Sequence, residues 1–192
     1  YVFHTAWAAR AVRALSPSEH YDIASSLYFA SLVSAFVPVR FFDYRPAELA
    51  LSNLSSEHAD LLALPFASGS IQTLSCMHVV EHIGLGRYGE PIDPDGDLRA
   101  IAELKRVVAP GGSLLFVVPV GGRPRLMFNA HRIYSIPMVL DEFADAFTLR
   151  ELALIPDDPA DGDLVTDPSE ALLRRQEYGC ACFRFEKSGS DA

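Results

Sequence analysis

Residues 71–83 read Ile71-Gln-Thr-Leu-Ser-Cys-Met-His-Val-Val-Glu-His-Ile83, an apolar run that gives way to polar side chains. Further along, the chain reads Asp97-Leu-Arg-Ala-Ile-Ala-Glu-Leu-Lys-Arg-Val-Val-Ala-Pro-Gly-Gly112 and Ser113-Leu-Leu-Phe-Val-Val-Pro-Val120. The apolar residues of 97–108 recur at helical spacing, and Pro-Gly-Gly ends the pattern. Two short apolar runs flanking an amphipathic helix predict a βαβ unit with a parallel sheet.

Outward from this unit, strands and helices alternate along the chain. The patterns predict strands at 20–23, 39–44, 59–62, 71–79, 113–118, 147–155 and 180–187, and helices at 5–15, 27–36, 97–108 and 134–143. We expect one domain over residues 1–192, with an N-terminal helix within residues 1–19 and an acidic excursion at 156–176 before the last strand. The predicted fold class is α/β, a doubly wound, mostly parallel seven-stranded sheet with one antiparallel edge strand.

The composition narrows the choice of partners. The 192 residues carry a net charge of −9, which argues against a nucleic-acid backbone as the main partner. We expect no membrane span, because no apolar run is long enough to cross a bilayer.

Cys76, Cys180 and Cys182 lack the spacing of metal ligands, so we expect no metal site and a reducing, cytoplasmic location. The default interpretation of Cys180 and Cys182, two apart on a strand, is a pair of small buried side chains. A small-molecule substrate is expected, and the oligomeric state stays open.

Two runs carry a family resemblance, Ser75-Cys-Met-His-Val-Val-Glu-His-Ile-Gly-Leu-Gly-Arg-Tyr-Gly89 and Phe128-Asn-Ala-His-Arg-Ile-Tyr134. With the order of elements from about residue 20 to residue 187, they resemble a class I S-adenosylmethionine-dependent methyltransferase, with its Rossmann-like fold. The resemblance is closest to a bacterial group of uncharacterised methyltransferase-like proteins, a domain of unknown function. It implies S-adenosyl-L-methionine as the cofactor and methyl transfer as the reaction.

The resemblance also implies where the cofactor binds. Asp22-Ile-Ala-Ser-Ser-Leu-Tyr-Phe29 matches the acid and glycine-rich turn of the family, but Ala24, Ser26 and Tyr28 hold the glycine positions. Ala and Ser can replace glycine where φ is ordinary, whereas the Tyr28 side chain must point away or partly fill the pocket. Asp43 matches the acid that holds the ribose, and Asp60 with Leu61 the pair that meets adenine. The implied cofactor contacts are Asp22, Ala24, Ser25, Ser26, Asp43, Tyr44, Asp60, Leu61, Met77 and His78.

Polar residues after the fourth and fifth predicted strands indicate an acceptor site. Arg87, Arg123, Arg125 and Arg132 are expected to gather at this edge of the sheet, with Tyr88 and Asn129 beside them. Guanidinium groups suit carboxylates and phosphates, so we expect a small anionic or glycan-related acceptor. His78 and His131 are the candidate general bases, and Tyr134 the candidate residue that orients the acceptor.

Two alternatives remain open. The degenerate glycine turn is also typical of a methyltransferase-like module that binds or assembles without catalysis. His78-Val-Val-Glu-His82 also spells the pattern of a zinc hydrolase, in which two histidines four apart on a helix bind the metal and a glutamate activates water. Because His78 closes a strand-like run, we expect the two imidazoles to diverge.

Overall fold

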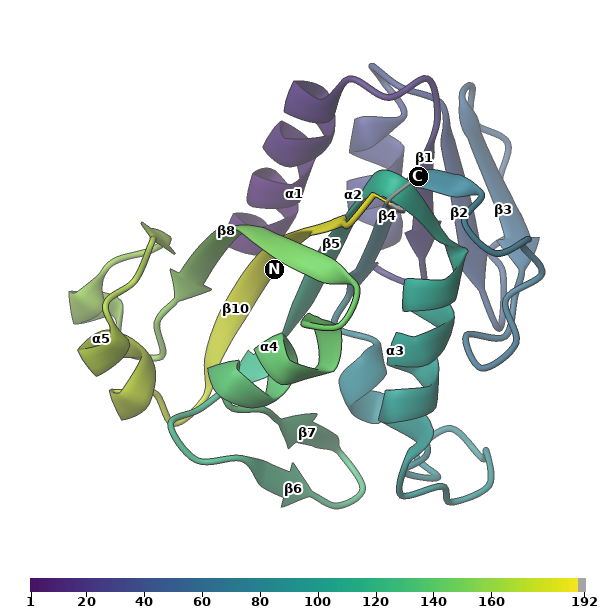
Figure 1. The fold of residues 1–192 in the computed structure, drawn as a ribbon. Helices are drawn as coiled ribbons and strands as arrows, with labels where there is room; N and C mark the ends of the chain where they lie inside the picture. Colours follow the sequence, from purple (N-terminus) through teal and green to yellow (C-terminus); the bar gives the residue numbers. More distant parts are fainter. Residues whose placement is uncertain (190–192) are drawn as a thin grey trace.

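A computed structural model describes residues 1–189, which form a sheet between two layers of helices (Figure 1). The strands are β1 His20–Ile23, β2 Val39–Asp43, β3 Leu54–His58, β4 Ile71–Met77, β5 Val108–Val120, β6 Arg125–Met127, β7 His131–Ile133, β8 Phe147–Ile155, β9 Val165–Thr166 and β10 Gly179–Lys187. The α-helices are α1 Val2–Leu15, α2 Leu27–Val33, α3 Gly96–Val107, α4 Ile136–Phe143 and α5 Glu170–Arg175. Two single 3₁₀ turns are η1 Val80–His82 and η2 Pro159–Asp161.

The main sheet has eight strands in the order β3-β2-β1-β4-β5-β10-β8-β9. β1 to β5 run parallel, while β10 is antiparallel to both of its neighbours, β5 and β8. The predicted doubly wound α/β fold is confirmed. The structure adds the short edge strand β9, which is antiparallel to β8, and places the long antiparallel strand β10 between β5 and β8. The strand order reverses between β1 and β4, and in such sheets ligands bind beyond the carboxyl ends of the strands at this point.

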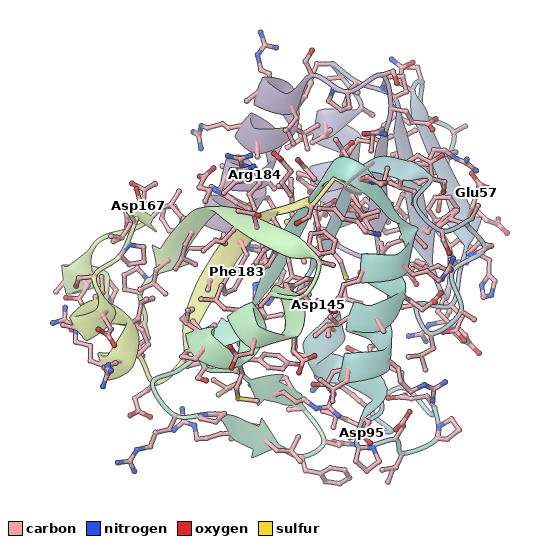
Figure 2. All side chains as sticks on the ribbon, viewed as in Figure 1. Glu57, Asp95, Asp145, Asp167, Phe183 and Arg184 are labelled. Carbon is pink, nitrogen blue, oxygen red and sulfur yellow. The ribbon has the colours of Figure 1, made fainter. Side chains whose placement is uncertain are left out.

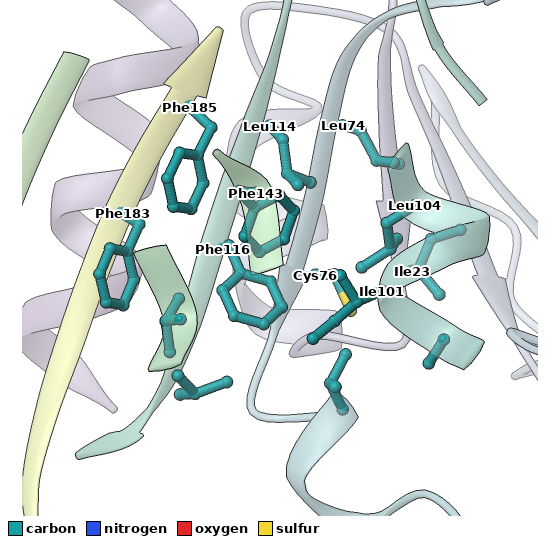
Figure 3. Close-up of a cluster of buried hydrophobic side chains, with 14 of the residues drawn as sticks. Ile23, Leu74, Cys76, Ile101, Leu104, Leu114, Phe116, Phe143, Phe183 and Phe185 are labelled. Atoms are coloured by element: carbon teal, nitrogen blue, oxygen red, sulfur yellow. The ribbon is translucent and has the colours of Figure 1, made fainter. Parts of the chain in front are cut away.

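Both faces of the sheet are buried under helices. Along β5, Leu114 and Phe116 face one hydrophobic cluster with α3 and α4, while Leu115 and Val117 face a second cluster with α1 and α2. This explains why the strand reads as a continuous apolar run rather than an alternating one. In the first cluster, Phe143 of α4 is fully buried and its ring stacks on that of Phe185 (centroids 4.4 Å apart) (Figure 3).

Charged side chains surround this core. Figure 2 shows Glu57 and Asp95 near the outline of the molecule; Asp145 is also exposed, whereas Phe183 is fully buried. Asp145 forms an ion pair with Lys105 of α3 (2.5 Å), a contact that links α3 to the end of α4. In the part of the chain that the structure describes, no helix is long and apolar enough to cross a membrane.

Some predicted elements are displaced. The third strand lies at 54–58 instead of 59–62, because β3 is an edge strand whose sequence, Leu-Ser-Ser-Glu-His, carries little apolar signal. The helix expected from residue 134 begins at Ile136, where Ser135 caps its amino end by accepting a hydrogen bond from Met138 N. The short hairpin β6–β7 and helix α5, which lies inside the acidic excursion, were not predicted.

Candidate functional site

The turn between β1 and α2 is fastened to the carboxyl end of β4. Ser25 N donates to Asp22 Oδ1 (3.0 Å), and Ser25 Oγ accepts from Met77 N (3.0 Å). The φ of Ser26 is ordinary (−103°), whereas Ala24 (φ 51°) adopts the left-handed conformation that glycine favours. The turn therefore keeps a glycine-like backbone path with small side chains.

Tyr28 does not obstruct this turn. Its side chain lies on α2 and is 84% exposed. Of the two alternatives that the sequence left open, the structure has the ring pointing away into solvent.

A buried polar network lies beneath the turn. Ser75 Oγ donates to Asp22 Oδ2 and contacts His20 Nε2 (2.9 Å), and His20 Nδ1 contacts Thr73 Oγ1 (3.2 Å). Burial raises the pKa of Asp22 to about 6, although hydrogen bonds from Ser75 and Ser25 act in the opposite direction. Burial lowers the pKa of His20 to about 3, so its imidazole is neutral at pH 7.

The other predicted cofactor residues lie at the neighbouring strand ends. Asp43 ends β2 and its Oδ1 accepts from Arg45 N (2.8 Å), and the exposed Asp60 follows β3, its Oδ1 accepting from Leu62 N (2.8 Å). Tyr44 is 67% exposed. Leu61 is buried in the main core, so its side chain is committed to packing within the protein.

A cavity of about 390 Å³ opens beside the end of β4. Four histidines from four segments line it, namely His4 of α1, His78 after β4, His82 of η1 and His131 of β7. Glu81, Arg87, Tyr88, Tyr178 and Cys180 also contribute to its wall. Because His78 directly follows Met77, the cavity begins one residue beyond the point where β4 is fastened to the turn after β1.

His78 is the central side chain of this cavity. Its Nδ1 lies 2.9 Å from Glu81 Oε1 and its Nε2 lies 3.4 Å from Cys180 Sγ. Burial lowers the pKa of His78, but the hydrogen bonds to Cys180 and Glu81 outweigh burial and raise the pKa to about 10. For Cys180, the hydrogen bond with Cys182 lowers the pKa, burial raises it and the hydrogen bond with His78 lowers it again, so the net shift is downward. A thiolate and an imidazolium are thereby stabilised against each other.

The remaining histidines are held differently. His131 stacks on Tyr178 (centroids 5.1 Å apart), and burial, together with the nearby His82, lowers its pKa. His82 Nδ1 lies 2.6 Å from Ala130 O. η1 is a 3₁₀ turn, and His78 and His82 direct ring nitrogens to Cys180 and Ala130, so the helical zinc-hydrolase arrangement is not formed.

Solved structures with this arrangement of elements include two methyltransferases in complex with S-adenosylhomocysteine. The 1,6-didemethyltoxoflavin-N1-methyltransferase of Burkholderia thailandensis matches with a TM-score of 0.67 and 13% identity, over 96% of this chain and 78% of its own. The N-methyltransferase NodS of Bradyrhizobium japonicum matches with a TM-score of 0.62 and 16% identity, over 96% and 85%. The chain has the class I methyltransferase fold.

The class I methyltransferase fold also occurs with another named activity. The cyclase SpnF matches with a TM-score of 0.60 and 14% identity, over 95% of this chain and 82% of its own.

Residues 55–149 match a family model described as a Caenorhabditis protein of unknown function, DUF268, and both runs that carry the sequence resemblance lie inside this segment. No curated protein matches the sequence. The reaction has to be argued from the site rather than from the fold.

Within this methyltransferase fold, Tyr134 does not reach the cavity. Its side chain is 5% exposed and its hydroxyl donates to Asp97 Oδ2 (2.9 Å). Burial, together with the charge of Asp97, raises the pKa of Tyr134. The prediction that Tyr134 orients an acceptor is therefore wrong, and the residue instead ties the end of β7 to the start of α3.

The predicted rim of four arginines does not form. Arg132 donates to Ile83 O (2.7 Å), and Arg125 forms an ion pair with Glu177 (2.6 Å). Arg123 and Asn129 are exposed on the segment after β5, whereas Arg87, with Tyr88, lines the cavity. Within residues 1–189, Arg87 is the only arginine that lines the cavity.

From the sequence, His4, Tyr178 and Cys180 were missed as residues of the cavity, and Glu81 had a role only in the zinc-hydrolase alternative. Glu81 is 1% exposed, with Oε1 on His78 and no hydrogen-bond partner for Oε2. Its place in the His78-Val-Val-Glu81-His82 pattern was the available signal, although that pattern suggested a different geometry. His4 and Cys180 are 176 positions apart, and no local pattern joins them.

Proposed function

We propose that this protein transfers a methyl group from S-adenosyl-L-methionine to a small acceptor bound in the histidine-lined cavity. The observation that carries the proposal is the hydrogen bond between Ser25 Oγ and Met77 N, which holds the turn after β1 against the strand end from which His78 enters the cavity. The turn proposed for the nucleoside and the cavity proposed for the acceptor then lie side by side, at the point in the sheet where ligands bind in this class of fold.

The residues at the turn fit the cofactor. Ala24, Ser25 and Ser26 are small and partly exposed, and the left-handed Ala24 lets a ligand approach the backbone closely. In this proposal the Asp43 carboxylate accepts hydrogen bonds from the ribose hydroxyls and Asp60 accepts one from the adenine amine. When bound, S-adenosylmethionine supplies the methyl group on a sulfonium.

His131 is the proposed general base for a hydroxyl acceptor. Its lowered pKa keeps the imidazole neutral at pH 7, so a ring nitrogen is free to take the acceptor proton. His78 is not the proposed base, because its raised pKa keeps it protonated and its two ring nitrogens already contact Glu81 and Cys180. Arg87 at the cavity wall suits an acceptor that carries a carboxylate or phosphate group.

Calorimetric titration with S-adenosylhomocysteine tests the cofactor site. We expect binding to the wild type and affinity weaker by about tenfold for Asp43→Ala, which removes the ribose acceptor. Asp145→Ala is the matched control, since Asp145 pairs with Lys105 on the surface, and it should bind as the wild type does. Absence of binding at millimolar ligand would overturn the proposal and leave a binding module without the cofactor.

A further inference from the structure

Three possible metal ligands meet in the cavity although they are far apart in the sequence. His4 comes from α1, His78 from the end of β4 and Cys180 from β10, and one ligand atom of each lies within 4.8 Å of the others. His78 Nε2 and Cys180 Sγ are already 3.4 Å apart. In a tetrahedral zinc site, neighbouring nitrogen and sulfur ligands are separated by about 3.4–3.6 Å. One pair therefore has the spacing of bound ligands, and the His4 donor lies within 4.8 Å of both.

The site also has the hydrogen bond that orients a ligating histidine. Glu81 Oε1 accepts from His78 Nδ1 (2.9 Å), which leaves Nε2 to face Cys180. Metal-bound histidines almost always donate their second ring nitrogen to such a carboxylate or carbonyl. Glu81 is 1% exposed and its Oε2 has no hydrogen-bond partner among the described residues, so one polar atom is buried here without a partner.

We propose that His4, His78 and Cys180 bind a zinc-class transition-metal ion whose fourth coordination position opens into the cavity. The donor set of two imidazoles and one thiolate selects zinc, cobalt or a similar metal rather than magnesium or calcium, which prefer oxygen. Three protein ligands with one open position are typical of catalytic zinc sites. The three donors lie outside the turn after β1, so metal binding can be measured in the absence of the cofactor.

The same residues also resemble a thiol nucleophile, base and orienting carboxylate, Cys180–His78–Glu81. Two observations favour the metal. His4 adds a third donor that a nucleophilic triad does not need, and its ring packs on that of His78 (centroids 4.8 Å apart). Cys180 lies within the sheet, where it pairs with Pro119 of β5 and Ile155 of β8. Its backbone is therefore used in strand pairing and does not form the oxyanion hole that a nucleophilic thiol needs beside it.

The test uses the full chain, stripped of metal under reducing conditions, and titrates it with Zn²⁺ and with Co²⁺ as a spectroscopic probe. We expect one equivalent of Zn²⁺ to bind with a dissociation constant below about 1 μM. The Co²⁺ form should show a thiolate-to-metal charge-transfer band that Cys180→Ser abolishes. Glu81→Gln should weaken binding by about 10- to 100-fold. Cys76→Ala is the matched control, because its thiol is buried in the main core, and it should leave the band intact.

A second measurement uses the wild-type chain alone and stands even if Cys180→Ser does not fold. Zn²⁺ should protect Cys180 from alkylation by iodoacetamide, as judged by mass mapping. Alkylation at an unchanged rate with Zn²⁺ present would overturn the proposal and favour the nucleophilic thiol. So would Co²⁺ binding without a thiolate band. Because S-adenosylhomocysteine binding is measured separately, loss of the metal proposal and loss of the proposed function give different results.

Discussion

Replacing Asp22 by Asn should stabilise the protein at neutral pH. The carboxylate is fully buried and its pKa is raised from 3.8 to about 6, so folding is opposed wherever the unfolded chain ionises this group. A shift of about two pKa units corresponds to about 3 kcal/mol at pH 8, and the same linkage leaves about 0.5 kcal/mol at pH 4. Well below pH 4 the group is protonated in both states, so this penalty vanishes there and grows as the pH rises toward 6.

The network around Asp22 can accept the amide of the Asp22→Asn variant. The introduced amide would keep its oxygen on Ser25 N and donate through its NH₂ group to Ser75 Oγ, which then donates to His20 Nε2. His20 Nδ1 in turn donates to Thr73 Oγ1, whose own hydroxyl donates to Glu19 O (3.2 Å). Each hydrogen bond of the network is kept, with donation reversed between residue 22, Ser75, His20 and Thr73, while Thr73 still donates to Glu19 O and the second amide N–H gains no partner.

Urea unfolding of the wild type and Asp22→Asn at pH 4 and pH 8 measures this difference. The advantage of the variant should grow from about 0.5 to about 3 kcal/mol between the two pH values. Asp60→Asn is the matched control, because its carboxylate is exposed and its Oδ1 contact to Leu62 N survives the change. A variant that is less stable than the wild type at pH 8 would refute the reasoning, since the hydrogen bonds to the carboxylate would then outweigh its burial.

Three further predictions concern stability. Tyr134→Phe should cost about 1–2 kcal/mol in urea unfolding, because Asp97 Oδ2 loses its hydroxyl partner, and should leave S-adenosylhomocysteine affinity unchanged; a large loss of affinity would restore a role in the site. Phe143→Ala should cost about 3–5 kcal/mol by emptying a fully buried site, and a cost near zero would contradict the packing of α4. His20→Gln should reduce the loss of stability between pH 7 and pH 4 by about 3 kcal/mol. The pKa of His20 falls from 6.5 to about 3 on folding, so the wild type loses folding free energy as the pH falls and the unfolded chain takes up a proton. An unchanged pH profile would count against a buried neutral imidazole.

The parts of the fold that the sequence predicted well are those with a strong local signal. The run 113–118 is buried on both faces and reads as uninterrupted apolar residues, and the amphipathic helix before it carries its own stop at Pro110-Gly-Gly. The edge strand β3 was misplaced because its side chains are half solvated and carry no such pattern. Strand placement at the sheet edge depends on pairing with β2, which is not visible in the local sequence.

The residues of the candidate site also differ in how well the sequence predicts them. Residues at strand ends, such as Asp22, Asp43 and His78, could be found because the order of strands places their carboxyl ends together. Tyr134 and Arg132 carry the right chemistry, but both side chains turn inward to Asp97, and the direction of a loop side chain cannot be derived from residue type alone. His4 lies close to Cys180 because of the way α1 packs on the sheet, and no local sequence pattern predicts that contact.

The central claim is that the turn after β1 and the end of β4 together bind the cofactor beside the cavity. Amide hydrogen exchange with and without saturating S-adenosylhomocysteine measures this directly, since ligand contact slows the opening of the segments that it covers. We expect new protection at residues 23–28 and 77–82, with the far edge of the sheet at β9 unchanged. Protection confined to other segments, or no protection at millimolar ligand, would contradict the claim.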